Sequence, residues 1–300
     1  MKAFIDRHRD VHGVEPICKV LPIAPSTYRR HAARQADPNR RSARAQRDER
    51  LCGEIQRVFE ENFRVYGADK VWKQLRREGV EVARCAVERL MRRLGLQGVR
   101  RGKPVKATVA DRSLPCPEDR VNRKFTADRP NALWVADFTY VSTARGFLYV
   151  AFVIDVFARY IVGWKVSRSA RADFVLDALD QAPHARRPFG PGSLIHHSDR
   201  GSQYVSIRYT ERLVEADVER SVGSVGDSYD NALAETINGL YKAEVIHRRS
   251  WHSLTEVEWA TLAWVDWFNH RRLLGPIGYV PPAEVEAAYY RSFTQSAIAA

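Results

Sequence analysis

The chain has 300 residues, with 48 Lys and Arg against 36 Asp and Glu, and its formal net charge is +12. A hydrophobic content of 45 % supports a substantial core, which excludes a disordered chain, a collagen-like repeat and a disulfide-rich miniprotein. Four widely spaced cysteines indicate reduced thiols, and the first residues lack the apolar segment of a secretory signal. Because no stretch approaches about 18 consecutive apolar residues, we expect no membrane partner and a cytoplasmic location.

The positive charge is concentrated in the first part of the chain. Residues 1–130 carry 31 Lys and Arg against 17 Asp and Glu, a net charge of +14, whereas residues 131–300 carry 17 against 19, a net charge of −2. This asymmetry predicts a front region that binds a polyanion, with nucleic acid as the expected partner, joined to a near-neutral globular region. A basic surface that is simply solvated is the alternative interpretation.

The front region is predicted to be helical. A short helix fits residues 15–21, and Ser26 is a candidate N-cap of a second one. Three amphipathic helices are expected next; Asp69 is the candidate cap of the middle one, which stops at Gly79, and Gly95 ends the last. Their apolar stripes are formed by Leu51, Ile55, Val58 and Phe59, by Val71, Trp72 and Leu75, and by Val87, Leu90, Met91 and Leu94.

The last of these helices is basic on its outer face. Short helices with a tight turn and a basic final helix are typical of a helix-turn-helix, whose second helix enters the major groove. Arg89, Arg92 and Arg93 are therefore candidate DNA contacts, although a three-helix bundle with incidental arginines has the same pattern. Residues 101–130 contain four prolines and eight basic residues without periodicity, which indicates a basic linker.

From residue 131 onward the pattern changes to strands that alternate with helices. Three adjacent strands followed by alternating helices and strands indicate an α/β fold with a mixed sheet. The strands are expected at 133–141, 147–155, 160–166, 194–197 and 218–222, and the helices at 170–182, at about 205–216 and from near 230 to about 246.

Three carboxylates occupy unusual positions in this region. Asp137 lies within an apolar strand, Asp199 at the end of another strand, and Glu235 one turn into the long helix. Burying an acid is costly unless it is paired or binds a cation, and carboxylate oxygens suit Mg²⁺ or Mn²⁺. Two such ions about 3.5–4 Å apart would support an in-line phosphoryl displacement. Taken singly, the acids also fit a satisfied strand acid, a helix N-cap and a surface residue.

The spacing of these acids is characteristic, since 35 residues lie between Asp199 and Glu235. With its surroundings, this pattern resembles the DDE integrase and transposase superfamily, and more closely the second-reading-frame (OrfB-type) transposase of the IS-three group of bacterial insertion sequences. The resemblance covers essentially the whole chain. Its motifs are Trp134–Tyr140, His196–Tyr204, Asp227–Lys242, Trp267–Arg272 and Pro281–Glu284, together with the helical segment from Tyr66 to Gly95.

The resemblance implies an RNase H-like mixed-sheet catalytic core preceded by an all-helical helix-turn-helix region. It implies that Asp137, Asp199 and Glu235 are catalytic and bind two Mg²⁺ or Mn²⁺ ions. Asn231 and Lys242 share a helical face with Glu235, so both are candidate contacts to the DNA backbone. The implied parts are a basic N-terminal helical segment (1–50), a helix-turn-helix-like region (51–100), a linker (101–130), the core (131–250) and a C-terminal helical extension (251–300).

The implied activity is metal-dependent cleavage of DNA at the ends of an insertion sequence, followed by transfer of the freed 3′-hydroxyl to a target. The implied partners are double-stranded DNA of the element ends and target, further copies of the chain, and the upstream-frame product of the same element. A bacterial, nucleoid-associated location follows. The alternatives are a DNA-binding protein without catalysis, such as a regulator of transposition, and a stand-alone nuclease on the same fold.

Several other side chains allow competing interpretations. Asp155, at the end of the second strand, is either a fourth carboxylate of the site or the residue that closes the hairpin turn. His8 and His12 form half of a zinc-binding pattern, but the matching pair of cysteines is missing, so we expect no structural zinc. His196, Ser198 and Asp199 are serine-hydrolase residue types without a G-x-S-x-G elbow, which argues against that class.

Overall fold

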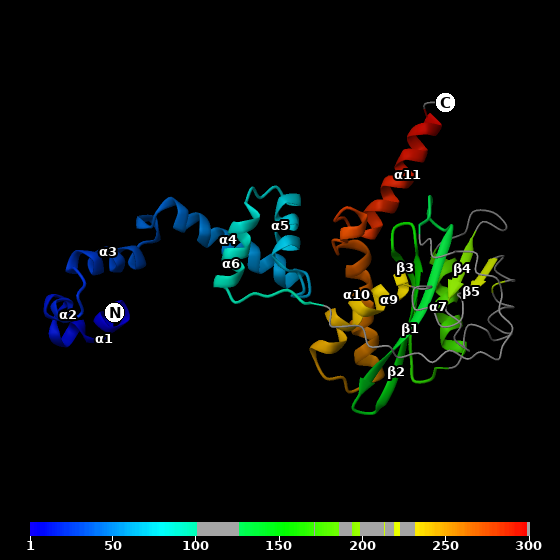
Figure 1. Cartoon of the computed structure of the whole chain (residues 1–300), viewed down its shortest axis with the longest axis horizontal. Helices are drawn as coiled ribbons and strands as arrows, with labels where there is room; N and C mark the ends of the chain where they lie inside the picture. Colours follow the sequence, from blue (N-terminus) through cyan, green and yellow to red (C-terminus); the bar gives the residue numbers. More distant parts are fainter. Residues whose placement is uncertain are drawn as a thin grey trace.

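A computed structural model describes residues 1–100, 126–170, 172–185, 194–198, 213, 219–222 and 232–298. Helices α1 (Lys2–His12), α2 (Val14–Val20) and α3 (Pro25–Ala36) form a small bundle at one end of the molecule, around Ile5 and Tyr28 (Figure 1). The prediction that Ser26 caps the second predicted helix is wrong. Helix α3 has Ala24 as its N-cap because Pro25, with its fixed φ and no N–H group, occupies the first helical position.

The helix-turn-helix-like region follows a short 3₁₀ turn, η1 (Pro38–Arg40). It consists of α4 (Ala43–Glu61), α5 (Ala68–Arg77) and α6 (Arg84–Arg93), so the predicted division at residue 50 falls inside α4. Gly79 and Gly95, both with positive φ, follow α5 and α6 as predicted. The predicted cap at Asp69 is wrong, because Gly67 is the N-cap. Asp69 lies in the first turn, where its negative charge interacts favourably with the helix dipole.

The predicted mixed sheet is confirmed, with the strand order β3-β2-β1-β4-β5. The antiparallel meander β1 (Leu133–Thr143), β2 (Gly146–Asp155) and β3 (Tyr160–Ser167) forms one side of it. On the other side, β4 (Ile195–Ser198) runs parallel to β1, and β5 (Glu219–Val222) runs parallel to β4. The helix expected at about 205–216 lies outside the described residues except for the helical Leu213.

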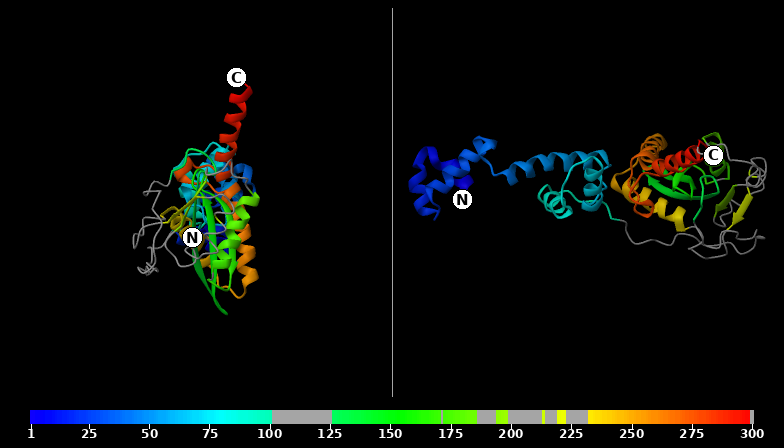
Figure 2. Two further views of the ribbon diagram at one scale, coloured as in Figure 1. Left: turned by 90° about the vertical axis from the view of Figure 1, so that its right-hand side faces the viewer. Right: turned by 90° about the horizontal axis from the view of Figure 1, so that it is seen from above.

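Helices cover both faces of the sheet (Figures 1 and 2). Helix α7 (Ala172–Ala185) packs on one face, where it buries Trp134 and Ala136 of β1. Helices α9 (Ala232–Glu244) and α10 (Leu254–His270), joined through the 3₁₀ turn η2 (Ile246–Arg248), pack on the other face, where α9 contacts β1 and β2 and α10 contacts β3. This alternation follows from the period of two along a strand, and it directs odd-numbered residues of β1 towards α9.

The helix-turn-helix-like region shares one hydrophobic core with the sheet layer and the C-terminal helices. The indole N–H of Trp267 on α10 donates to Asn62 Oδ1 at 3.0 Å, and the backbone N–H of Leu273 donates to the Tyr66 hydroxyl at 2.7 Å. The chain then forms η3 (Gly275–Ile277) and ends in α11 (Pro282–Ile298). Within the described ranges, none of the helices combines the length and apolar character needed to cross a bilayer.

Candidate functional site

Asp137 lies on β1, half-buried, on the sheet face that α9 covers. Its Oδ1 accepts a hydrogen bond from the backbone N–H of Phe138 at 2.8 Å, and its Oδ2 accepts one from the Asn238 side-chain amide on α9 at 2.9 Å. These two donors stabilise the ionised carboxylate and fix its orientation. Each oxygen retains further lone pairs, so the group can still bind a cation.

Glu235, Asn238 and Lys242 occupy one face of α9 because three- and four-residue steps bring side chains to the same side of a helix. Glu235 is exposed in the first turn, whereas Asn238 is buried beside Asp137. The ammonium of Lys242 lies 4.4 Å from the centre of the Tyr140 ring on β1. The docking of α9 on β1 therefore brings Asn238 and Lys242 close to Asp137, and Glu235 lies on the same helical face one turn before Asn238.

The electrostatic environment of Lys242 reflects this proximity. Burial lowers the pKa of its ammonium, and the negative charge of Asp137 acts in the opposite direction and favours the charged form. Tyr140 in turn makes an edge-on ring contact with Phe147 on β2, at 5.7 Å between ring centres. Both aromatic side chains are exposed, so the cation lies beside an accessible aromatic surface.

Asn238 is a residue of the site that the sequence reasoning did not assign. It lies three residues after Glu235 and four before Lys242, and this helical spacing was the available indication. Its side-chain amide donates to Asp137. Asn238 therefore connects the acid on β1 to α9, the helix that carries Glu235 and Lys242.

Two predicted site residues, Asp199 and Asn231, lie outside the described residues. The described part of β4 ends at Ser198, which pairs in parallel register with Ala136, the residue before Asp137. Among the described residues, no group of three His, Cys, Asp or Glu side chains lies close enough to bind one metal ion.

Asp155 is fully buried at the end of β2, opposite Trp134 rather than Asp137. Its Oδ2 accepts the backbone N–H of Asn131 at 2.8 Å, and its Oδ1 accepts that of Phe157 at 3.0 Å. These contacts fit the interpretation that Asp155 closes the turn after the second strand; they do not test the alternative that it is a fourth carboxylate of the site.

The three candidate arginines on α6 differ in their surroundings. Arg89 forms an ion pair with Asp48 of α4 at 2.8 Å and lowers the pKa of that carboxyl, while Arg93 donates to Cys52 Sγ at 2.8 Å. Arg92 has a side chain that is 78 % exposed and pairs with the exposed Glu88. Helix α5 contacts the C-terminal region through Lys70, Lys73 and Arg77. Helix α6 exposes Arg84, Cys85 and Glu88, so it is the accessible helix of the pair.

Comparisons with known proteins agree with this architecture. Residues 127–228 match an integrase core domain family, residues 216–282 match a second integrase core domain model, and residues 46–104 match an HTH-like domain. The chain is 60 % identical over 300 residues to the transposase for insertion sequence element IS629 of Shigella sonnei, covering 100 % of both chains.

Two further relatives extend the comparison. The putative transposase for insertion sequence element IS986/IS6110 of Mycobacterium tuberculosis is 57 % identical over 274 residues, which cover 90 % of this chain and 97 % of the relative. Transposase InsF for insertion sequence IS3A of Escherichia coli is 32 % identical over 244 residues, covering 81 % and 83 %.

Proposed function

Since this chain belongs to the insertion-sequence transposases of the IS-three group and is a DNA transposase with an integrase core, we propose that Asp137, Asp199 and Glu235 form its active site. The observation that carries the proposal is the 2.9 Å hydrogen bond between Asp137 and Asn238, which fixes the strand acid against the helix that bears Glu235 and Lys242. Asp199 directly follows the strand that pairs with β1 just before Asp137.

The donor set fits divalent cations. Integrase cores depend on such ions, and carboxylate oxygens from a strand and a helix are the hard ligands that Mg²⁺ and Mn²⁺ prefer. We assign two ions to the three carboxylates; when bound, they supply Lewis acidity that activates the attacking oxygen and stabilises charge on the scissile phosphate. Asn238 orients Asp137 for this task through its amide.

The remaining side chains bind DNA in this proposal. Lys242 contacts the backbone beside the scissile phosphate as a point charge, and Asn231 contributes a polar contact from the segment before α9. On the accessible helix α6, Arg92 reaches the DNA of the element end, with Arg89 and Arg93 on its flank. Cleavage by water precedes attack of the freed 3′-hydroxyl on the target, and copies of the chain act together with the upstream-frame product.

Strand nicking and joining on an oligonucleotide that carries the element end, in Mn²⁺, tests the proposal. Glu235→Gln is expected to abolish both steps while DNA binding is retained, and Glu258→Gln on α10 is the matched control that keeps activity. Parallel reactions include the upstream-frame product. Binding without cleavage by the wild-type chain, even with that product, would support a non-catalytic DNA-binding protein instead.

A further inference from the structure

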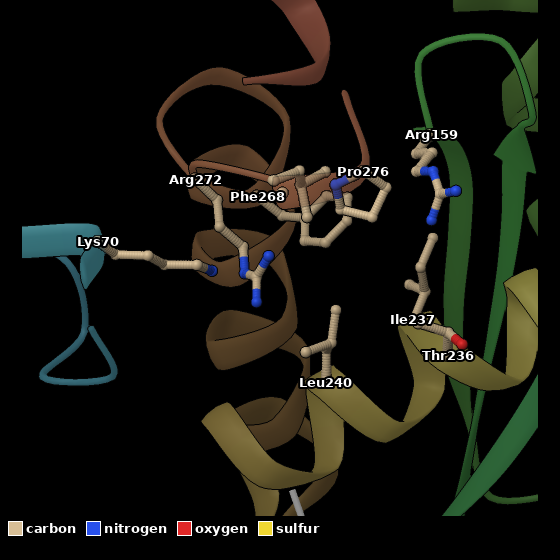
Figure 3. A pocket seen from close by; sticks show the side chains of 10 residues that line it. Lys70, Arg159, Thr236, Ile237, Leu240, Phe268, Arg272 and Pro276 are labelled. Atoms are coloured by element: carbon tan, nitrogen blue, oxygen red, sulfur yellow. The ribbon is translucent and has the colours of Figure 1, made fainter. Parts of the chain in front are cut away.

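A cavity of about 190 Å³ lies where the helix-turn-helix-like region meets the catalytic core (Figure 3). Three cationic side chains from separate parts of the chain line it: Lys70 of α5, Arg159 of the turn between β2 and β3, and Arg272 after α10. Figure 3 shows the Lys70 ammonium and the Arg272 guanidinium directed towards each other, with Arg159 on the opposite side. The other described lining residues are Thr236, Ile237, Leu240, Phe268, Leu274, Gly275 and Pro276.

The positive charge of the cavity is only partly neutralised. The buried carboxylate of Glu244 forms an ion pair with Arg272 through both of its oxygens. The Nε of Arg272 lies 3.2 Å from Oε1 and 3.1 Å from Oε2. In the described part of the chain, neither Lys70 nor Arg159 has an ion-pair partner. Burial, and then the neighbouring charge of Arg272, lower the pKa of Lys70 to about 8, and burial lowers the pKa of Arg159.

The backbone of Arg159 supplies an independent observation. Its φ is 61°, a left-handed conformation that glycine adopts at much lower cost than arginine. A glycine would therefore close this turn more favourably, yet the position carries a long cationic side chain that lines the cavity. Strained backbone that places a charged group in a cavity is typical of a binding site.

We propose that this cavity binds a phosphate group of a nucleotide, with Lys70 and Arg159 as its principal ligands. Leu240 and Pro276, whose side chains are accessible, form an apolar wall on which the sugar or base of the nucleotide packs. An anion bound here contacts α5 and the sheet turn at once, so it fixes the helix-turn-helix-like region against the core. The phosphate belongs either to a DNA strand or to a free nucleotide, and the site does not depend on the roles assigned to Asp137 and Glu235.

Thermal unfolding of the full chain in EDTA, at constant ionic strength, tests the site with three probes: inorganic pyrophosphate, thymidine monophosphate and a ten-nucleotide oligothymidine. At ten times its Kd, a ligand is expected to raise Tm by about 3 °C. Lys70→Met and Arg159→Gly are expected to lose this rise. Without ligand, both variants are expected to unfold at or above the wild-type Tm, because one removes a buried charge and the other relieves backbone strain.

Arg145→Gly, in the exposed turn between β1 and β2, is the matched control, because it removes one positive charge from a turn of the same sheet and should retain the full rise. A rise produced by oligothymidine alone identifies a DNA strand as the source, whereas a rise with pyrophosphate or the mononucleotide identifies a free ligand. No rise with any probe, or equal rises in wild type, Lys70→Met and Arg159→Gly, would overturn the proposal.

Discussion

The buried pair between Glu244 and Arg272 permits a quantitative prediction about how the C-terminal region is held to the core. Their side chains are 6 % and 4 % exposed, and Glu244 Oε2 also accepts the indole N–H of Trp264 at 3.0 Å. Replacing Arg272 with Met keeps the apolar stem but leaves the buried carboxylate without its ion-pair partner. Removing one partner of such a pair costs about 3–5 kcal/mol of unfolding free energy.

The double variant Arg272→Met/Glu244→Gln separates the charge effect from packing. It removes both charges together, and the amide oxygen of the new Gln side chain still accepts from Trp264. Its free energy of unfolding is expected within about 1 kcal/mol of the wild type, because replacing a whole buried ion pair is often nearly neutral. The two single variants are each expected to be much less stable than the double variant.

Urea unfolding followed by far-UV circular dichroism and tryptophan fluorescence measures these differences. Arg92→Met is the control, since its pair with Glu88 is exposed and is expected to contribute less than about 0.5 kcal/mol. A loss below about 1 kcal/mol for Arg272→Met would refute the reasoning. So would a double variant as unstable as the sum of the two single variants.

Three further predictions concern packing, pH and catalysis. Gly163→Ala places a Cβ 2.0 Å from a carbonyl oxygen of α7, so it is expected to lower the unfolding free energy by about 1–3 kcal/mol. Gly53→Ala on α4 places its Cβ in open space and is expected to raise the unfolding free energy by about 1 kcal/mol in the same urea assay. The pKa of Lys70 falls from its ordinary value of 10.5 to about 8 on folding, so the unfolding free energy is expected to increase as the pH is raised from about 8 to 10.5. Measured over a series of pH values, the Lys70→Met variant is expected to lack this increase. Asn238→Ala is expected to lower the cleavage rate about tenfold to a hundredfold at unchanged DNA affinity, since Asp137 loses its orienting donor; an unchanged rate would contradict that role.

The strands and the main helices could be predicted from the sequence because their determinants are local. Runs of apolar, β-branched and aromatic residues gave β1 and β2, and Gly79 and Gly95 marked helix ends correctly. The two predicted helix caps were wrong because the helices begin earlier than the predicted capping residues, with Ala24 and Gly67 as N-caps, neither of which makes a side-chain cap. Pro25 occupies the first helical position of α3, so the N-cap is Ala24, two residues before the expected Ser26.

The candidate site was predictable where burial made a residue costly and otherwise only by resemblance. Asp137 stood out as an acid in an apolar strand, but its partner Asn238 is 101 positions away and was fixed by how α9 docks on β1. Interpreting Asp155 also required its contacts: its sequence context is comparable, yet it accepts hydrogen bonds from the backbone N–H groups of Asn131 and Phe157.

The contact between the helix-turn-helix-like region and the core could not be predicted from the periodicity of the sequence. Asn62 and Tyr66 end one helix and precede the next, and their polar partners, Trp267 and the backbone of Leu273, lie more than 200 positions away. Because these hydrogen bonds are buried, losing either one leaves a desolvated polar group, which gives the contact a defined geometry as well as apolar packing. Helix α6 therefore keeps a fixed position relative to the catalytic core.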